Sequence, residues 1–311
     1  MPADYEQDRV LVTCASGKQG TDLIPQLYGK WKKLRLQVVS DSSKEQLRKQ
    51  YPNAEVVQAD LAMVQDCKRI LEGVTACYFV GPSFHPHETR CGYNIVDAAI
   101  AQRSAGGPFQ HMVYSSVLFP ILRKLLNHDC KRYIEEYLVE SGVPYTVLQP
   151  THLNETFPIA KVLNDEKPVY PAAWNPDVKF SFCTTKDLGE ASARVLEQRE
   201  KHYWATYQLV STPEPLSYTE VCKIVSKVIG KEIEVKPKAF EDAVSTMLSM
   251  VVGNLPHGGE QATKEIGARM LLYYNDRGLV GNNNVTEMLL GHKTMTYEEW
   301  AKAKVEELKK Q

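Results

Sequence analysis

The stretch VLVTCASGKQGTDLI, residues 10–24, places three β-forming residues directly before a short polar turn. The turn contains Gly17 and Gly20, and a helix is expected to begin near Lys18. A strand–turn–helix of this kind presents free backbone N–H groups and the positive end of a helix dipole to an anion. Cys14 stands where a dinucleotide fingerprint has its first glycine, and a small cysteine can replace that glycine if its φ is negative. Taken alone, the pattern also fits an ordinary βα turn.

Short apolar segments alternate with helical ones through the first half of the chain. Strands are predicted at Arg9–Thr13, Leu34–Ser40, Ala54–Gln58, Ala76–Val80, His111–Ser115 and Tyr145–Gln149. Helices are predicted near residues 18–29, 43–51, 64–72, 87–103 and 128–141. The alternation is typical of an α/β fold, and it predicts a Rossmann-type, doubly wound parallel sheet with helices on both faces.

The pattern changes after Pro150, where proline and aromatic residues become frequent. We therefore expect a Rossmann domain over residues 1–155 and a smaller C-terminal lobe over residues 156–311, from which some segments pack back on the sheet. The helices expected in this half cover 186–198, a segment that begins with a Ser217/Glu220 capping box and ends at Gly230, and an exposed terminal run from Glu298 to Lys310.

Composition sets limits on the class of protein. The 311 residues are 43% hydrophobic and 24% charged, with a net charge of −1, which gives no electrostatic case for nucleic acid or an anionic membrane. The apolar stretches are too short to span a bilayer, and the first residues are polar and acidic. The seven cysteines form no CxxC motif, which favours reduced thiols inside the cell. We expect a soluble cytoplasmic protein.

Two acidic positions strengthen the nucleotide-binding interpretation of the first turn. Asp41 closes the second predicted strand, 21 residues after Gly20, where a carboxylate can accept a hydrogen bond from an adenosine ribose. Asp60 and Leu61 follow the third strand, where the adenine ring would lie. A single aspartate is as easily explained as a helix cap or a solvent contact. Together, these features predict a dinucleotide site.

Several segments give the chain a family resemblance. They are VTCASGKQG, AEVVQADL, HMVYSSV, CKRYIEEYLVESGVPYTVLQP and TTKDLGEASARVL. In order and spacing they resemble the NmrA-like proteins, which are atypical short-chain dehydrogenases/reductases related to plant isoflavone-reductase-like enzymes. The resemblance runs from Val10 to about Val235. It implies a Rossmann domain, a C-terminal substrate lobe, and NAD(P) lying across the carboxyl edge of the sheet.

The resemblance also implies which residues hold the cofactor. They are Cys14, Gly17, Lys18, Gln19, Gly20, Asp41, Asp60, Leu61, Gly81, Lys131 and Pro150. Members of the family usually have a glycine at the position of Cys14, and many have an arginine where Asp41 stands. An aspartate about 4 Å from a 2′-phosphate would be repelled by roughly 4 kcal/mol per unit charge at an effective dielectric constant near 20. We therefore expect NAD to be favoured over NADP.

Catalysis is where the chain departs most from ordinary short-chain dehydrogenases. Those enzymes use a Tyr-xxx-Lys pair, and by resemblance Lys131 is the lysine, but Asn127 occupies the tyrosine position and has no proton to give. The candidate catalytic residues are Lys131, His128, which could titrate near neutral pH, and Ser115 with its neighbour Ser116. His128 is equally well explained as a polar residue at a helix start, and the serines as a polar strand end.

Other signals are weaker. His85 and His87 have metal-ligand character, but no nearby cluster completes a site, so no metal is expected. The segments VYPAAWNP, residues 169–176, and RMLLYYNDRG, residues 269–278, are rich in aromatic residues that could line an apolar pocket.

Three functions fit these observations. The first is an NAD(P)-dependent oxidoreductase that acts on an apolar, aromatic or heterocyclic small molecule, for example in secondary metabolism. The second is a redox-sensing regulator that binds the dinucleotide without turnover and holds a protein partner, a role that also allows a nuclear location. The third is an enzyme that keeps the dinucleotide as a scaffold and catalyses a non-redox cyclisation.

Overall fold

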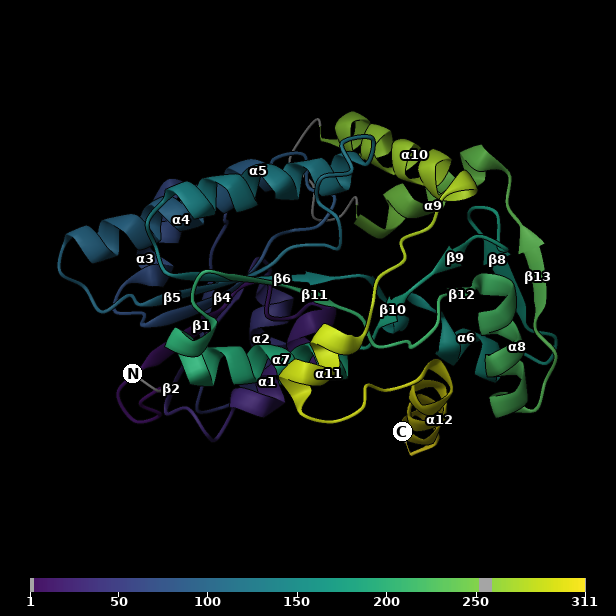
Figure 1. Cartoon of the computed structure of the whole chain (residues 1–311), viewed down its shortest axis with the longest axis horizontal. Coiled ribbons are helices and arrows are strands. Elements are labelled where there is room, and N and C mark those ends of the chain that lie inside the picture. Colours follow the sequence, from purple (N-terminus) through teal and green to yellow (C-terminus); the bar gives the residue numbers. More distant parts are fainter. Residues whose placement is uncertain (1–2, 252–258, 311) are drawn as a thin grey trace.

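A seven-stranded parallel sheet forms the centre of the computed structural model, which describes residues 3–251 and 259–310 (Figure 1). The strand order is β11-β6-β5-β4-β1-β2-β3. The strands are β1 (Arg9–Val12), β2 (Lys33–Val38), β3 (Glu55–Gln58), β4 (Ala76–Val80), β5 (His111–Ser115), β6 (Tyr145–Pro150) and β11 (Ala205–Leu209). The predicted Rossmann-type fold is confirmed, and the strand order reverses between β1 and β4.

Helices cover both faces of this sheet (Figure 1). One face carries α3 (Val64–Leu71), α4 (Glu88–Ser104) and α5 (Leu126–Glu140). The other carries α1 (Lys18–Leu27), α2 (Asp41–Gln50), α7 (Thr185–Gln198) and α11 (Asn284–Leu290). Each layer buries its own hydrophobic cluster against the strands, as expected for a parallel sheet whose strands are apolar on both faces.

The second predicted strand is too long by two residues. The side chain of Ser40 accepts a hydrogen bond from the backbone N–H of Ser43 at 3.2 Å, so Ser40 caps a helix. As a result, β2 ends at Val38 and α2 begins at Asp41. Asp41 therefore does not close a strand but stands in the first helical turn, where an acidic side chain is favoured by the helix dipole.

The remaining elements form a smaller lobe beyond the carboxyl ends of the strands (Figure 1). Its three two-stranded sheets pair β10 (Phe182–Cys183) with β7 (His152–Leu153), β12 (Leu216–Ser217) with β9 (Lys179–Phe180), and β13 (Glu234–Pro237) with β8 (Val169–Ala172). Its helices are η1 (Asn154–Thr156), α6 (Ile159–Asn164), α8 (Tyr218–Ile229), α9 (Phe240–Val251), α10 (Glu260–Asp276) and α12 (Tyr297–Lys309), while η2 (Arg199–His202) follows α7.

Two expectations for this half have different outcomes. The capping box of Ser217 and Glu220 is confirmed, as is the end of α8 at Gly230, whose φ is +70°. The terminal helix is not simply exposed, because α12 buries Tyr297, Trp300 and other apolar residues against α6 and α8. Hydrophobic residues at helical spacing within a highly charged segment were the signal for this packing.

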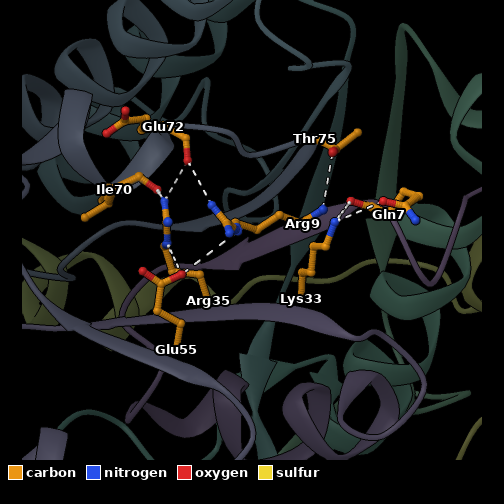
Figure 2. A network of polar contacts seen from close by, with 8 residues as sticks. All are labelled: Gln7, Arg9, Lys33, Arg35, Glu55, Ile70, Glu72 and Thr75. Carbon is orange, nitrogen blue, oxygen red and sulfur yellow. Dashed lines mark hydrogen bonds and ion pairs between the residues drawn. The ribbon is translucent and has the colours of Figure 1, made fainter.

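A network of polar side chains lies near the amino ends of β1, β2 and β3 (Figure 2). The guanidinium of Arg35 in β2 donates to the carbonyls of Ile70 and Glu72 at 2.7 and 3.0 Å, and to the carboxylate of Glu55 at 2.9 Å. Arg9 donates to the same Glu72 carbonyl at 3.4 Å. These bonds satisfy carbonyls at the end of α3 that have no partner within the helix. The network ties α3 to β1 and β2 far from the carboxyl edge.

Candidate functional site

A cavity of about 420 Å³ lies at the carboxyl ends of β1, β2 and β3, beside the point where the strand order reverses. In open α/β sheets this is where ligands bind. Its lining residues are Cys14, Ser16, Gly17, Gln37, Val38, Val39, Ala59, Asp60, Leu61, Pro82, Ser83, His85 and Cys91. We call this cavity the switch-point groove. Of the residues predicted to bind a cofactor, Cys14, Gly17, Asp60 and Leu61 line it.

The backbone of the first turn is braced by a residue that sequence reasoning missed. The buried Gln37 accepts from the N–H of Cys14 through its side chain at 2.8 Å and from the N–H of Ala15 through its carbonyl at 2.9 Å. Its amide nitrogen donates to the carbonyl of Ala59 at 2.7 Å, which links the ends of β1, β2 and β3. The only signal in the sequence was a polar residue within an otherwise apolar strand end.

Cys14 differs from the condition under which it was expected to replace a glycine. Its φ is +46°, in the left-handed region, rather than negative. Only glycine adopts this region freely, since an L-residue pays roughly 1–2 kcal/mol there. The position thus has a backbone conformation that favours glycine although the side chain is a cysteine. Burial raises the pKa of its thiol to about 12, and the charge of Glu88 adds to this effect.

The two glycines of the turn keep side chains away from the start of α1. Gly17 precedes the helix without a side-chain cap, so the first N–H groups of α1, from Lys18 and Gln19, are available to an anion. A Cβ on Gly17 would lie 3.1 Å from the carbonyl oxygen of Cys14, and one on Gly20 only 2.0 Å from that of Ala15. The turn with Gly17 and Gly20, together with the N-terminus of α1, therefore fits the pyrophosphate of a dinucleotide.

The adenosine end of the groove departs from expectation at one residue. Asp60 starts the turn before α3, where its carboxylate accepts from the N–H of Ala62 at 2.8 Å, and Leu61 is buried beside it. From the end of β2, the groove takes Gln37, Val38 and Val39. Asp41 lies two residues further along, exposed in α2. Solvent screens such a charge, so its repulsion of a phosphate falls toward about 1 kcal/mol.

A buried ion pair lies next to Gly81, at the end of β4, and its two residues do not line the groove. The ammonium of Lys131 in α5 binds the carboxylate of Glu88, which is 2% exposed in the first turn of α4. Burial alone would lower the pKa of Lys131, but the charge and hydrogen bond of the Glu88 carboxylate, together with Cys130, outweigh burial and raise the pKa. A Cβ on Gly81, just after β4, would lie 3.4 Å from the same carboxylate. Glu88 was missed because an acidic residue at a helix start is ordinary.

Ser115 and Pro150 mark the ends of neighbouring strands at this edge. Ser115 is the last residue of β5 and is 2% exposed, with Ser116 buried after it. Pro150 closes β6, and its carbonyl accepts from the N–H of Leu118 at 2.8 Å. Gln19, in the first turn of α1, accepts from the hydroxyl of Tyr78 at 2.8 Å. The structure thus brings most predicted site residues to one edge.

His128 does not have the properties expected of it. Its ring is 1% exposed; Nδ1 lies 3.2 Å from the carbonyl of Phe119, and Nε2 lies 3.4 Å from the hydroxyl of Tyr274. Because a carbonyl only accepts, Nδ1 carries the proton, and the Tyr274 hydroxyl donates to Nε2. Burial lowers the pKa of His128 to about 4, so the expectation that it titrates near neutral pH is wrong. Nor is it a solvated residue at a helix start.

The C-terminal lobe covers the beginning of α5 with aromatic rings. His152 stacks on Phe180 with centroids 4.5 Å apart, and both rings contact Tyr274 edge-on at 5.1 and 5.2 Å. The amide of Asn127 lies 3.8 Å from the sulfur of Met270 in α10. The position of the missing tyrosine thus faces the lobe.

The two aromatic segments singled out in the sequence meet at a second cavity, of about 450 Å³. Its lining residues are Ala172, Ala173, Trp174, Asn175, Pro176, Pro237, Lys238, Phe240, Leu271, Leu272 and Asn275. It shares no lining residue with the switch-point groove. A third cavity, of about 540 Å³, borders α1 at Lys18 and has apolar walls from Phe157 and Trp300. The lobe therefore offers apolar surfaces on two sides.

Two features are absent from the described residues: a cluster of metal ligands and a helix that could span a membrane. Within 3–251 and 259–310, no group of three or more His, Cys, Asp or Glu side chains could hold a metal ion. His85 instead lines the groove, and its Nδ1 accepts from the N–H of His87 at 3.1 Å. All seven cysteines are free thiols. In the same ranges, no helix has the length and apolar character to cross a bilayer.

The fold and the glycine turn agree with a family assignment. The model of the NmrA-like family matches residues 6–299, and the chain belongs to that family. Agroclavine dehydrogenase of Claviceps fusiformis is 30% identical over 97 residues, which are 30% of this chain and 32% of that enzyme. The match thus spans about a third of this curated relative.

Solved structures resemble the chain over nearly all of its length. The NADPH complex of the NADPH-dependent quinone oxidoreductase of Escherichia coli has a TM-score of 0.73 at 22% identity, covering 95% of this chain and 99% of the other. The NADP(H) complex of the triphenylmethane reductase of Citrobacter sp. gives the same values. NmrA, a negative transcriptional regulator in complex with NAD, has a TM-score of 0.72 at 19% identity and covers 98% of both chains. At these identities the likeness establishes the fold.

Buried histidines predict how stability depends on pH. The pKa of His128 is about 4 and that of His152 about 3 in the folded chain, and both should return to about 6.5 on unfolding. Below pH 6.5 the unfolded chain takes up protons that the folded chain does not. The free energy of unfolding should therefore fall as the pH drops from 7 to 4, by at most about 1.4 kcal/mol per pH unit for each histidine.

Urea unfolding followed by circular dichroism at several pH values measures this slope. His128→Asn, whose amide can still donate to Phe119, should flatten it. His292→Asn is the control, because the carbonyl of Lys293 and the carboxylate of Glu190 raise the pKa of His292, and its contribution has the opposite sign. An equal slope in wild type and His128→Asn would contradict the prediction.

Proposed function

We propose that the chain is an NAD(P)-dependent reductase that acts on an apolar, aromatic or heterocyclic small molecule. The observation that carries the proposal is the switch-point groove at the glycine turn, where a Cβ on Gly17 or Gly20 would meet the backbone. The buried Lys131–Glu88 pair lies at the same edge of the sheet, next to Gly81 at the end of β4. Bound NAD(P)H would supply the hydride. Gly17, Gly20 and the N-terminus of α1 would hold the pyrophosphate, and Asp60 and Leu61 would lie beside the adenosine.

Lys131 is the side chain that we assign to the nicotinamide end. It comes from α5, and its carboxylate partner adjoins Gly81 at the end of β4. Its ammonium would donate to the ribose beside the nicotinamide and support proton transfer, directly or through a water. The raised pKa keeps Lys131 charged at neutral pH, which favours the orienting role over that of a proton donor.

The other candidates for proton transfer are poorly suited at neutral pH. Asn127 has no titratable proton, and the low pKa of His128 leaves it neutral, with Nε2 occupied by Tyr274. Burial raises the pKa of the Tyr274 hydroxyl, which makes it a weak acid. Hydride acceptors that need no proton from the protein, or that take one from water, are therefore the substrates that suit this site best.

A regulator that binds the dinucleotide without turnover is the second candidate. The observation in its favour is the same ion pair, because a lysine neutralised by Glu88 beside Asn127 lacks the proton-transfer pair of ordinary short-chain dehydrogenases. Such a protein would use its surface for a protein partner. NAD(P)H oxidation measured with a panel of quinones and cationic aromatic heterocycles separates the two, since tight binding without turnover favours the regulator.

Gly17→Val tests the dinucleotide site. The φ of Gly17 is −79°, so valine is compatible with the backbone, but its Cβ would press against Cys14 and push the turn away from the pyrophosphate. Calorimetry should show NADH or NADPH affinity at least about tenfold lower, or 1.4 kcal/mol, in a folded protein. Cys14→Gly is the matched control and should bind normally, because glycine suits the positive φ. Unchanged affinity in folded Gly17→Val would remove the basis of the proposal.

Asp41→Arg tests the preference for NAD. We expect wild type to bind NADH more tightly than NADPH, and the variant to shift that ratio toward NADPH by about tenfold as a repulsion becomes an attraction. Glu45→Arg, one turn further along α2, makes the same charge change as a control. A wild type that prefers NADPH about tenfold or more would show that Asp41 does not face the 2′ position.

Lys131→Met tests the role of the lysine, since it removes the charge but keeps much of the apolar stem. Turnover should fall by about 10²-fold or more, with a smaller loss of dinucleotide affinity. Asn127→Ala should cost far less. Near wild-type turnover in Lys131→Met would contradict the assignment of Lys131.

A further inference from the structure

Glu88 has the surroundings of a functional carboxylate although no sequence pattern points to it. It is 2% exposed, and it forms an ion pair with Lys131 from the next helix of the layer. Taking two charges out of water costs several kcal/mol, and replacing such a pair by apolar residues is often neutral or stabilising. Stability alone is therefore a weak reason for a buried Glu–Lys pair at this place.

The carboxylate lies where the strand order reverses. The ideal Cβ position of Gly81, after β4, is 3.4 Å from its Oε1, so the backbone passes closely beside it. Its negative charge also reaches Cys14 after β1, Tyr114 in β5 and Cys130 in α5, because it contributes to the raised pKa of each. Glu88 thus adjoins the structural elements that would surround the nicotinamide end of a bound dinucleotide.

We propose that Glu88 is the positioning residue of the dinucleotide site. Its carboxylate holds the ammonium of Lys131 beside the end of β4, so that the ammonium donates to the hydroxyls of the ribose next to the nicotinamide. The inference rests on the proposed function and deepens it, because it names the residue through which Lys131 acts and the part of the ligand that depends on it.

The pair can be tested by pH because its neighbours do not titrate in the same range. Burial raises the pKa of the Cys14 and Cys130 thiols to about 12, and those of Cys91 and Tyr114 further. Burial also lowers the pKa of His85 and His128, which leaves both neutral above pH 7. Glu135, beside Tyr114, is a carboxyl group whose pKa burial raises. Lys131 is then the group whose charge Glu88 controls at alkaline pH.

The experiment measures NADH, NADPH and ADP binding by calorimetry at pH 7 and pH 9. ADP lacks the nicotinamide-side ribose and serves as the control ligand. In wild type, affinity for the dinucleotide should hardly change between the two pH values. In Glu88→Gln, burial without a counter-ion lowers the pKa of Lys131, so dinucleotide affinity should fall about tenfold from pH 7 to pH 9 while ADP affinity stays constant.

A double variant keeps the test decisive if an unpaired ammonium impairs folding. Glu88→Gln combined with Lys131→Met removes both buried charges; it should bind ADP like wild type and the dinucleotide more weakly, with no dependence on pH. The proposal is overturned if Glu88→Gln or the double variant binds the dinucleotide as wild type does at both pH values. It is also overturned if ADP loses the same affinity, which indicates a general structural effect. A wild type that binds neither NADH, NADPH nor ADP contradicts the proposed function instead.

Discussion

The close approach of α1 to the turn that precedes it is the constraint on which this structure depends. A Cβ on Gly20 would lie 2.0 Å from the carbonyl oxygen of Ala15, so only a glycine fits at this position in the first turn of α1. A second glycine repeats the arrangement, because a Cβ on Gly189 in α7 would lie 2.9 Å from the backbone of Asp22. Because α1 and α7 pack closely, α7 from the second half of the chain lies on the sheet that the first half forms, where it contacts β4, β5 and β6.

The two halves of the chain do not fold as separate units, because segments of the second half belong to the central sheet and its helical layer. The segment after α7 adds β11 to the edge of the central sheet beside β6, and α11 then packs on α7 and β11. Elements of the lobe are therefore preceded and followed in the chain by segments that pack on the central sheet. Through Tyr274 and Met270 it contacts His128 and Asn127 at the start of α5, so the lobe completes the surroundings of the candidate site.

The titratable groups around the site are suited to binding but not to proton transfer at neutral pH. A neutral His128, a protonated Tyr274 and a charged Lys131 follow from burial and from one carboxylate, and none of them is an acid poised near pH 7. The arrangement suits a protein that orients a dinucleotide and leaves the proton to the substrate or to solvent. The same features serve hydride transfer to an electron-poor substrate or binding without reaction, so the choice between reductase and regulator depends on the substrate.

By itself, the sequence determined the layers of the fold and the place of the glycine turn, because strand-to-helix alternation, capping residues and glycines act locally. It therefore predicted β1 to β6 of the central sheet to within two residues, the capping box at Ser217, and the gathering of Gly17, Asp60 and Lys131 at one edge, but not β11. Only the tertiary structure decided their environment. The positive φ of Cys14 and the loss of titration at His128 depend on neighbours that are distant in the chain. The partnership of Glu88 with Lys131, 43 residues later, has the same origin, since a pKa and a contact are set by packing.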